Sequence, residues 1–209
     1  RSWRTHTLGD YWVFDLNTRK LQQLGQFAEP STLQFAKFDP AAERVAYVVK
    51  NNIYVEALAS GEVTQLTHDG NDTIVNGTFD WVNEEEFFLR DGFRWSPDGE
   101  QIAYWQLDTE GTPIFTMINN TDTLYPTLKT FPYPKVGETN AAMRIGVMDA
   151  DGSDTTWMQV PGDPRQHYLV RMQWAGNSEE LLIQQLTRSQ AVNKVFIANA
   201  ANGGVSELL

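Results

Sequence analysis

Three consecutive glutamates, Glu84, Glu85 and Glu86, stand inside an apolar stretch of the chain. They follow Asp-Trp-Val at residues 80–82 and precede Phe-Phe-Leu at residues 87–89, so side chains on both sides can anchor them. Anchored carboxylates repel, by about 4 kcal/mol for unit charges about 4 Å apart at an effective dielectric constant of about 20. We therefore expect the glutamates to bind a cation. The alternative is a solvated acidic turn or the first turn of a helix, where carboxylates meet the positive end of the helix dipole.

The motifs of the common catalytic centres are absent from the sequence. There is no G-x-S-x-G nucleophile elbow, no H-E-x-x-H zinc motif and no phosphate-binding P-loop. There is also no cysteine, which excludes disulfides and thiolate nucleophiles. The three histidines, His6, His68 and His167, lie in polar, turn-like sequence and are predicted to be at the surface. We therefore predict no catalytic residue and no cofactor in this chain.

An aspartate-rich segment resembles part of a calcium-binding loop. Asp149, Asp151 and Asp154 are spaced like the first ligands of such a loop, but the bidentate glutamate required at the twelfth position is replaced by Val160. The segment is better explained as a polar turn, and no metal site is predicted.

The overall charge restricts the class of partner. The chain has a net charge of −11, and its 16 lysines and arginines are scattered. Nucleic acids and anionic membranes are bound by clustered basic residues, so neither is expected as a partner. No run of 18 or more apolar residues occurs, and no membrane-spanning segment is predicted.

Short apolar strands recur along the chain in pairs joined by polar turns. Four hairpins of this kind are predicted at residues 11–25, 53–70, 144–162 and 194–209. A second kind of hairpin precedes the last three, at residues 33–49, 92–107 and 170–186. In the second kind an aromatic residue, Phe38, Trp95 or Trp174, ends the first strand before a tight turn. Two hairpins make a four-stranded blade, and a repeat of about 40 to 50 residues is typical of a propeller.

The predicted fold class is all-β: a partial β-propeller of four-stranded antiparallel blades with an inserted two-stranded arm. Its parts are expected at about residues 1–30, 31–70, 92–160 and 165–209 for the blades, 80–88 for an acidic insertion and 107–137 for the arm. A closed ring needs four to eight blades, so we expect this chain to form part of a ring. A β-sandwich is the alternative fold, and a long surface loop is the alternative to the arm.

Four motifs occur in a fixed order in the middle of the chain. They are D-W-V-x-E-E-E-F at 80–87, W-S-P-D-G-x-x-I-A-Y at 95–104, T-E-x-x-P at 109–113 and Y-P-K-x-G-x-x-N at 133–140. Together they resemble the propeller domain of the dipeptidyl peptidase IV family, in the form found in its bacterial members. The resemblance extends from the start of the chain to about Gln173.

This resemblance implies roles for several residues. A glutamate pair matching Glu85 and Glu86 binds the N-terminal ammonium of a peptide, whereas the glutamate matching Glu84 is not the main contact. An arginine matching Arg4, which follows Trp3, contacts a peptide carbonyl. The family's arm takes part in dimerisation, so a homodimer is expected.

The resemblance also implies a function for the parent protein. Family members are serine peptidases that release X-Pro or X-Ala dipeptides from peptide N-termini, with a Ser-Asp-His triad on a C-terminal α/β-hydrolase domain. We expect this propeller chain to recognise the free N-terminus and gate substrates, to contact that hydrolase domain, and to be inactive alone. We also expect a bacterial, periplasmic or secreted location. The alternative function is a non-enzymatic periplasmic propeller that serves as a scaffold or binding module.

Overall fold

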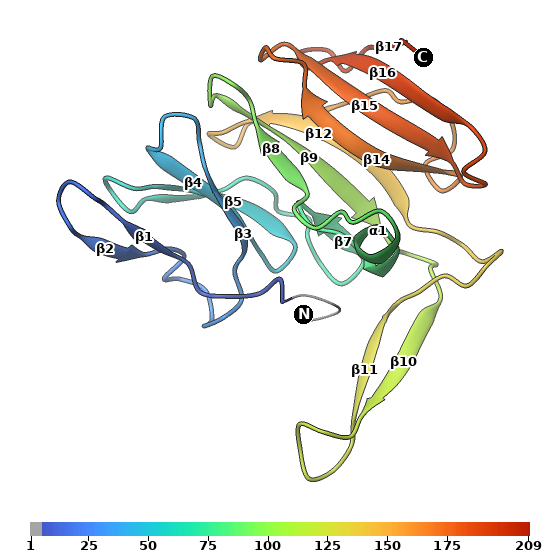
Figure 1. Cartoon of the computed structure of the whole chain (residues 1–209), viewed down its shortest axis with the longest axis horizontal. Coiled ribbons are helices and arrows are strands. Elements are labelled where there is room, and N and C mark those ends of the chain that lie inside the picture. Colours follow the sequence, from blue (N-terminus) through green and yellow to red (C-terminus); the bar gives the residue numbers. More distant parts are fainter. Residues whose placement is uncertain (1–5) are drawn as a thin grey trace.

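Antiparallel hairpins make up nearly all of the regular structure in the computed structural model, which describes residues 6–209. Over these residues the strands form five antiparallel sheets. Figure 1 shows four of the sheets arranged in an arc, from β1–β2 at one end to β14–β17 at the other, with the fifth projecting from it. The fold is therefore all-β and partial-propeller, as predicted. No helix in this part of the chain is long and apolar enough to cross a membrane.

The first complete blade is a regular four-stranded sheet. Its strands are β3 (Gln34–Phe38), β4 (Arg44–Val49), β5 (Asn52–Ala57) and β6 (Val63–Gln65), paired in that order. A two-stranded hairpin, β1 (Trp12–Phe14) with β2 (Leu21–Gln23), lies next to this blade.

The last blade repeats the same order. It contains β14 (His167–Trp174), β15 (Glu180–Thr187), β16 (Asn193–Asn199) and β17 (Val205–Glu207). All seven hairpins predicted from the sequence are confirmed by the strand pairing.

The middle blade differs from the other two at its inner edge. Its sheet order is β13 (Thr156–Trp157), β12 (Ala142–Asp149), β9 (Gln101–Asp108) and then β7 (Ile74–Asn76), with β8 (Phe93–Trp95) also paired to β9. Thus β7 and β8 are two halves of one inner strand. The blade therefore begins at β7 and not at residue 92. β7 was missed because α1 and β8 separate it in the chain from β9, its partner, so no turn marks the pair as a hairpin.

Two glycines join the halves of this divided strand. Gly77 donates its N–H to the Trp105 carbonyl (3.0 Å), and Gly92 accepts from the Trp105 N–H (3.0 Å), so both occupy one rung of the ladder. Gly92 also donates to the Gly77 carbonyl (2.9 Å). A Cβ on Gly92 would lie 2.6 Å from the Gly77 carbonyl carbon, and Gly77 has a φ of +69°. Residues 78–91 therefore leave the inner strand and return to the same point.

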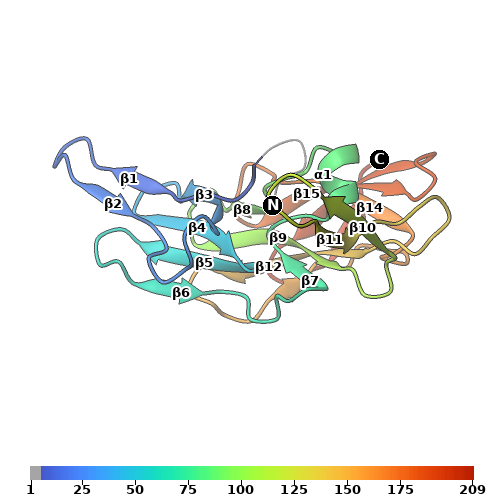
Figure 2. The same ribbon diagram turned by 90° about the horizontal axis from the view of Figure 1, so that it is seen from below.

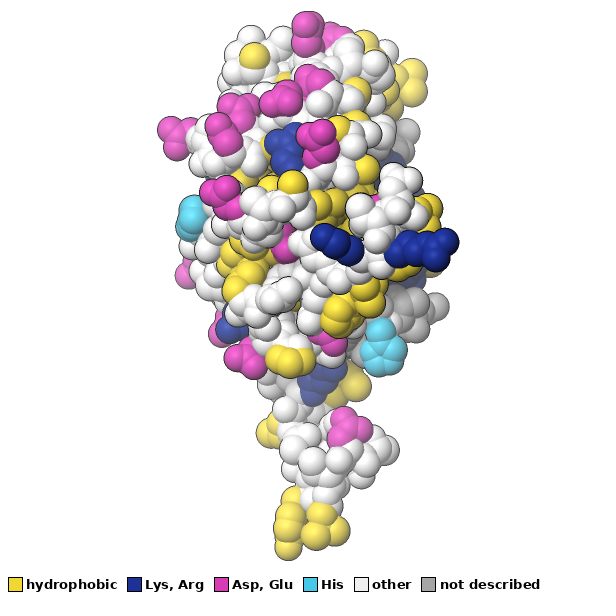
Figure 3. Space-filling model, turned by 90° about the vertical axis from the view of Figure 1, so that its left-hand side faces the viewer, with side chains coloured by type: hydrophobic (Ala, Val, Ile, Leu, Met, Phe, Trp, Pro, Cys, Tyr) yellow, Lys and Arg dark blue, Asp and Glu magenta, His cyan; other side chains and the backbone are white. Residues whose placement is uncertain are grey.

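The arm is inserted between β9 and β12 and consists of β10 (Ile114–Asn119) and β11 (Thr127–Pro132). It projects away from the blades in Figure 1, and Figure 3 shows hydrophobic side chains at its tip. The exposed large apolar residues on it include Ile114, Ile118, Leu124, Tyr125 and Leu128. The predicted two-stranded arm, and not a loop, is present.

Tryptophans at the ends of inner strands link neighbouring blades. Trp95 donates its indole N–H to the Lys37 carbonyl (3.1 Å) on β3, and Trp174 donates to the Arg94 carbonyl (3.2 Å) on β8. The aromatic residues that marked the repeat in the sequence thus also fix the position of each blade against the previous one. Phe38, at the same position of the first blade, has no such donor and is exposed.

Candidate functional site

A single short helix, α1 (Trp81–Glu86), carries the three glutamates and lies within the excursion of residues 78–91. Asp80 caps it: its Oδ1 accepts from the Asn83 backbone N–H (3.0 Å) and from Asn83 Nδ2 (2.7 Å). Glu84 lies in the first turn, where a carboxylate is stabilised by the helix dipole. The helix ends before Phe88, whose φ is +59°. The local structure is therefore the helical turn considered as an alternative above.

A helix of six residues is not stable by itself, so tertiary contacts must hold it. The Trp81 ring packs against Tyr133 at the base of the arm, with centroids 4.4 Å apart. At the other end the Phe87 ring packs on Tyr168 of β14, with centroids 4.8 Å apart. Arg171 of β14 donates to the Phe87 carbonyl (3.2 Å). The helix is thus held between the arm and the last blade, and it protrudes from one face of the arc in Figure 2.

The three glutamates differ in exposure because successive helical residues point about 100° apart. Glu84 is 5% exposed, Glu85 is half-buried and Glu86 is exposed. Glu84 is therefore directed toward the protein interior, whereas Glu85 and Glu86 reach the surface.

Glu86 borders a groove of about 810 Å³ between α1, the base of the arm and the last blade. Its walls combine one carboxylate, a group of aromatic rings and two basic side chains, contributed among others by Glu86, Phe115, Phe131, Tyr133, Tyr168, Lys135 and Arg188. The aromatic rings contact one another: Phe115 and Tyr133 have centroids 5.4 Å apart. Arg188 also donates to the carbonyl of Glu138, which joins the last blade to the segment that follows the arm. The groove can accommodate an extended, amphipathic ligand beside the acidic helix.

Residues 1–208 match the family model for the dipeptidyl peptidase IV N-terminal region. The chain belongs to this family. The acidic helix, the arm and the blades described above are therefore those of a dipeptidyl peptidase IV N-terminal region.

Similar proteins span bacteria, fungi and mammals. A crystal structure of Porphyromonas gingivalis dipeptidyl peptidase 4 superposes with a TM-score of 0.91 at 26% identity, covering 100% of this chain and 29% of that one. A probable dipeptidyl-aminopeptidase B of Phaeosphaeria nodorum is 26% identical over 96% of this chain and 24% of its own length. The inactive dipeptidyl peptidase 10 of Rattus norvegicus is 29% identical over 94% of this chain and 25% of its own length. The chain thus spans about a quarter of the length of the curated relatives it matches.

Two of the three predicted ligand-binding residues belong to the described part of this N-terminal region. Glu85 and Glu86 lie together on α1, and Glu86 lines the groove. Arg4, the third predicted residue, lies outside the described residues. Tyr168 and Arg171, which hold the end of the helix, were not found from sequence, because nothing in their spacing relates them to residues about 80 positions earlier.

His167 corrects one expectation about this dipeptidyl peptidase IV region, because it is 5% exposed and not at the surface. It begins β14, and its Nδ1 is 3.0 Å from the side-chain amide of Gln185 on β15. Burial lowers the pKa of His167 and outweighs the interactions that favour its charged form. The ring is therefore a neutral part of the blade and does not line the groove.

Proposed function

We propose that this chain recognises the free N-terminus of peptide substrates for a dipeptidyl peptidase, with Glu85 and Glu86 binding the ammonium group. The observation that carries the proposal is the position of these two carboxylates, on a helix held from both ends beside a groove. An α-amino group has an ordinary pKa of about 7.7 to 8 and is mostly cationic at pH 7. Charge-assisted hydrogen bonds to carboxylates then fix its position.

Fixing the N-terminus would determine where the peptide is cut. An extended peptide advances about 3.3 Å per residue, so a nucleophile about 7 Å from the anchored amine meets the bond after the second residue. The glutamates would thus set the length of the product and take no part in bond cleavage. An acetylated N-terminus would be rejected, because it carries no positive charge for the carboxylates to bind.

The proposal extends to the activity of the full-length parent protein. It would be a serine-type dipeptidyl peptidase that releases X-Pro or X-Ala dipeptides through a Ser-Asp-His triad on an α/β-hydrolase domain beyond this chain. The arm, with its exposed apolar side chains, supports a homodimer. A bacterial, periplasmic or secreted location is part of the same proposal. The chain alone would bind peptides weakly and cleave none.

A second candidate is a parent that binds without cleaving. It is favoured by the rat relative, which is named as an inactive dipeptidyl peptidase. A fluorophosphonate probe, which labels activated serines, separates the two candidates: labelling of the full-length protein supports the peptidase, and failure to label supports a binding module or scaffold.

Substitution of the glutamates tests the recognition step. We expect Glu86→Gln and Glu85→Gln in the full-length protein each to lower kcat/KM for Gly-Pro-anilide about 10- to 100-fold, the effect of a lost hydrogen bond to a charged group. Glu100→Gln is the matched control, since Glu100 is exposed in a turn of the same blade. Equal fluorophosphonate labelling of all variants shows that the hydrolase domain is intact. A change of less than threefold in both variants would show that the ammonium binds elsewhere.

A further inference from the structure

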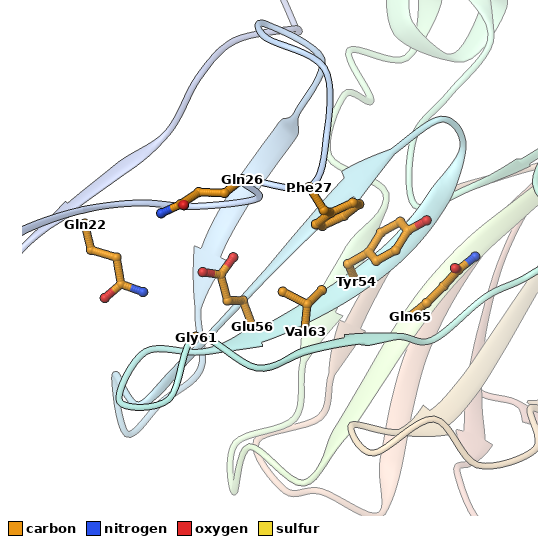
Figure 4. A pocket seen from close by; sticks show the side chains of 8 residues that line it. All are labelled: Gln22, Gln26, Phe27, Tyr54, Glu56, Gly61, Val63 and Gln65. Atoms are coloured by element: carbon orange, nitrogen blue, oxygen red, sulfur yellow. The ribbon is translucent and has the colours of Figure 1, made fainter.

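A second cavity lies far from the acidic helix, between the β1–β2 hairpin and the outer strands of the first complete blade. It has a volume of about 600 Å³. Figure 4 shows the side chains that line it: Gln22 and Gln26 come from the hairpin and the loop after it, and Tyr54, Glu56 and Val63 come from β5 and β6. Neither lysine nor arginine is among the described residues lining this cavity.

The Glu56 carboxylate is the distinctive group in this cavity. Glu56 is only 4% exposed. Its Oε2 accepts from the Gly25 backbone N–H (2.8 Å) and from the Tyr47 hydroxyl (2.9 Å). Its Oε1 makes no hydrogen bond with the described residues, and no described lysine or arginine forms an ion pair with Glu56. A buried carboxylate without a cation is costly, so this site favours a ligand that supplies one.

Besides burial, the charge of Glu56 also raises the pKa of Tyr47, its hydrogen-bond partner. Burial raises the pKa of Tyr47, and the hydrogen bond to Glu56 and the negative charge of Glu56 raise it further. Tyr47 therefore remains a neutral donor and does not neutralise the carboxylate.

The rest of the cavity selects the kind of cation. Gln26 donates through Nε2 to the Gln23 carbonyl (3.4 Å), which leaves its own carbonyl oxygen as an acceptor. In Figure 4 the Glu56 carboxylate points toward the side of Gln22 and Gln26, whereas Phe27 and Tyr54 lie at the opposite end. The two rings contact each other, with centroids 5.0 Å apart. Acceptors at one end and aromatic rings at the other suit a cation with an apolar chain.

We propose that this cavity binds a primary alkylammonium group, with the ammonium on Glu56 Oε1 and the alkyl chain along Val63, Phe27 and Tyr54. The source is either a small free amine or the side chain of a lysine on a peptide or protein. A metal ion would need several converging oxygen ligands, whereas Glu56 is the single carboxylate among the described residues that line the cavity.

Saturation-transfer NMR on the full-length protein tests the proposal, with n-butylammonium as the charged probe and 1-butanol as its neutral counterpart. We expect n-butylammonium to bind at least tenfold more tightly than 1-butanol. Glu56→Gln, which keeps the shape of the side chain and the acceptor for Gly25 and Tyr47, should weaken the binding of n-butylammonium at least tenfold. Phe27→Leu, at a half-exposed position, should weaken this binding about 2- to 5-fold through lost apolar contact with the alkyl chain, without affecting folding.

Glu86→Gln distinguishes this cavity from the acidic helix. If binding of n-butylammonium is lost in the Glu86→Gln variant and retained in the Glu56→Gln variant, the amine binds at the helix and the inference is wrong. Equal binding of 1-butanol overturns it as well. If Glu56→Gln does not fold, unchanged affinity in Phe27→Leu is the result that overturns it. A capped peptide, acetyl-Gly-Lys-Gly-amide, separates the sources: binding of both probes identifies a lysine side chain, and binding of the amine alone identifies a small free amine.

Discussion

Adding one methyl group at Gly92 should loosen the acidic helix. Gly92 is the point at which residues 78–91 rejoin the inner strand. A Cβ there would lie 2.6 Å from the Gly77 carbonyl carbon and 2.7 Å from the Thr78 nitrogen, both of which are backbone atoms. No side chain can rotate away to relieve these contacts. In Gly92→Ala the two ends of the excursion must therefore move apart.

The free-energy cost of this clash is comparable to that of overpacking a protein core. Forcing an extra carbon into a packed site costs about 1–3 kcal/mol. Because about 1.36 kcal/mol corresponds to a factor of ten, local opening of the excursion should increase about 5- to 150-fold. The 2.9 Å hydrogen bond from Gly92 to the Gly77 carbonyl is the contact expected to break first.

Hydrogen–deuterium exchange with mass spectrometry measures this opening in the full-length protein. Peptides that cover residues 78–91 should exchange faster in Gly92→Ala, whereas peptides from the last blade should not change. Gly9→Ala is the matched control, since a Cβ there meets no atom within 4 Å and its φ is not in the left-handed region. If exchange of residues 78–91 in Gly92→Ala stays within twofold of that in Gly9→Ala, the reasoning is refuted.

Two further predictions concern the contacts of the helix and the inner strands. Double-mutant cycles of Trp81→Leu and Tyr133→Leu should give a coupling of about 0.5–1.5 kcal/mol, measured by exchange of residues 81–86, because the rings pack 4.4 Å apart; additive effects would mean that the arm does not hold the helix. Burial lowers the pKa of Lys37 to about 8 from 10.5, although Asp91 opposes the shift. Between these values the unfolded chain binds the extra proton, so stability rises with pH. Apparent Tm of the wild type should therefore rise relative to Lys37→Met from pH 8 to 10.5; a constant difference would contradict this.

Much of the architecture could be predicted from local patterns. The turn at Pro97–Gly99 and the aromatic residues before each turn identified the hairpins, because these signals lie within a few residues of one another. The arm was also predicted, because Pro126, Pro132 and Pro134 lie in a segment rich in apolar residues and would not be accommodated in a central strand. The division of the inner strand into β7 and β8 was not found. Their adjacency depends on a contact between Gly77 and Gly92, which no local pattern records.

The residues that form the two cavities were even harder to predict from the sequence. The charge run indicated a cation-binding segment, but its groove requires Tyr133 from the arm and Tyr168 from the last blade. Glu56 was not singled out at all, because a lone glutamate in an apolar strand gives no sign that it will be buried without a cation.

By itself, the sequence determined the repeat, the hairpins from which the blades are built and the position of three charges in the chain. These depend on residue types close to one another along the backbone. Only the tertiary structure decided which of the glutamates face outward and which elements hold their helix. It also decided that Glu56 opens on a second cavity. The physical reason is that burial and unpaired charge are properties of surfaces brought together from distant segments, and these surfaces exist only after the blades have packed.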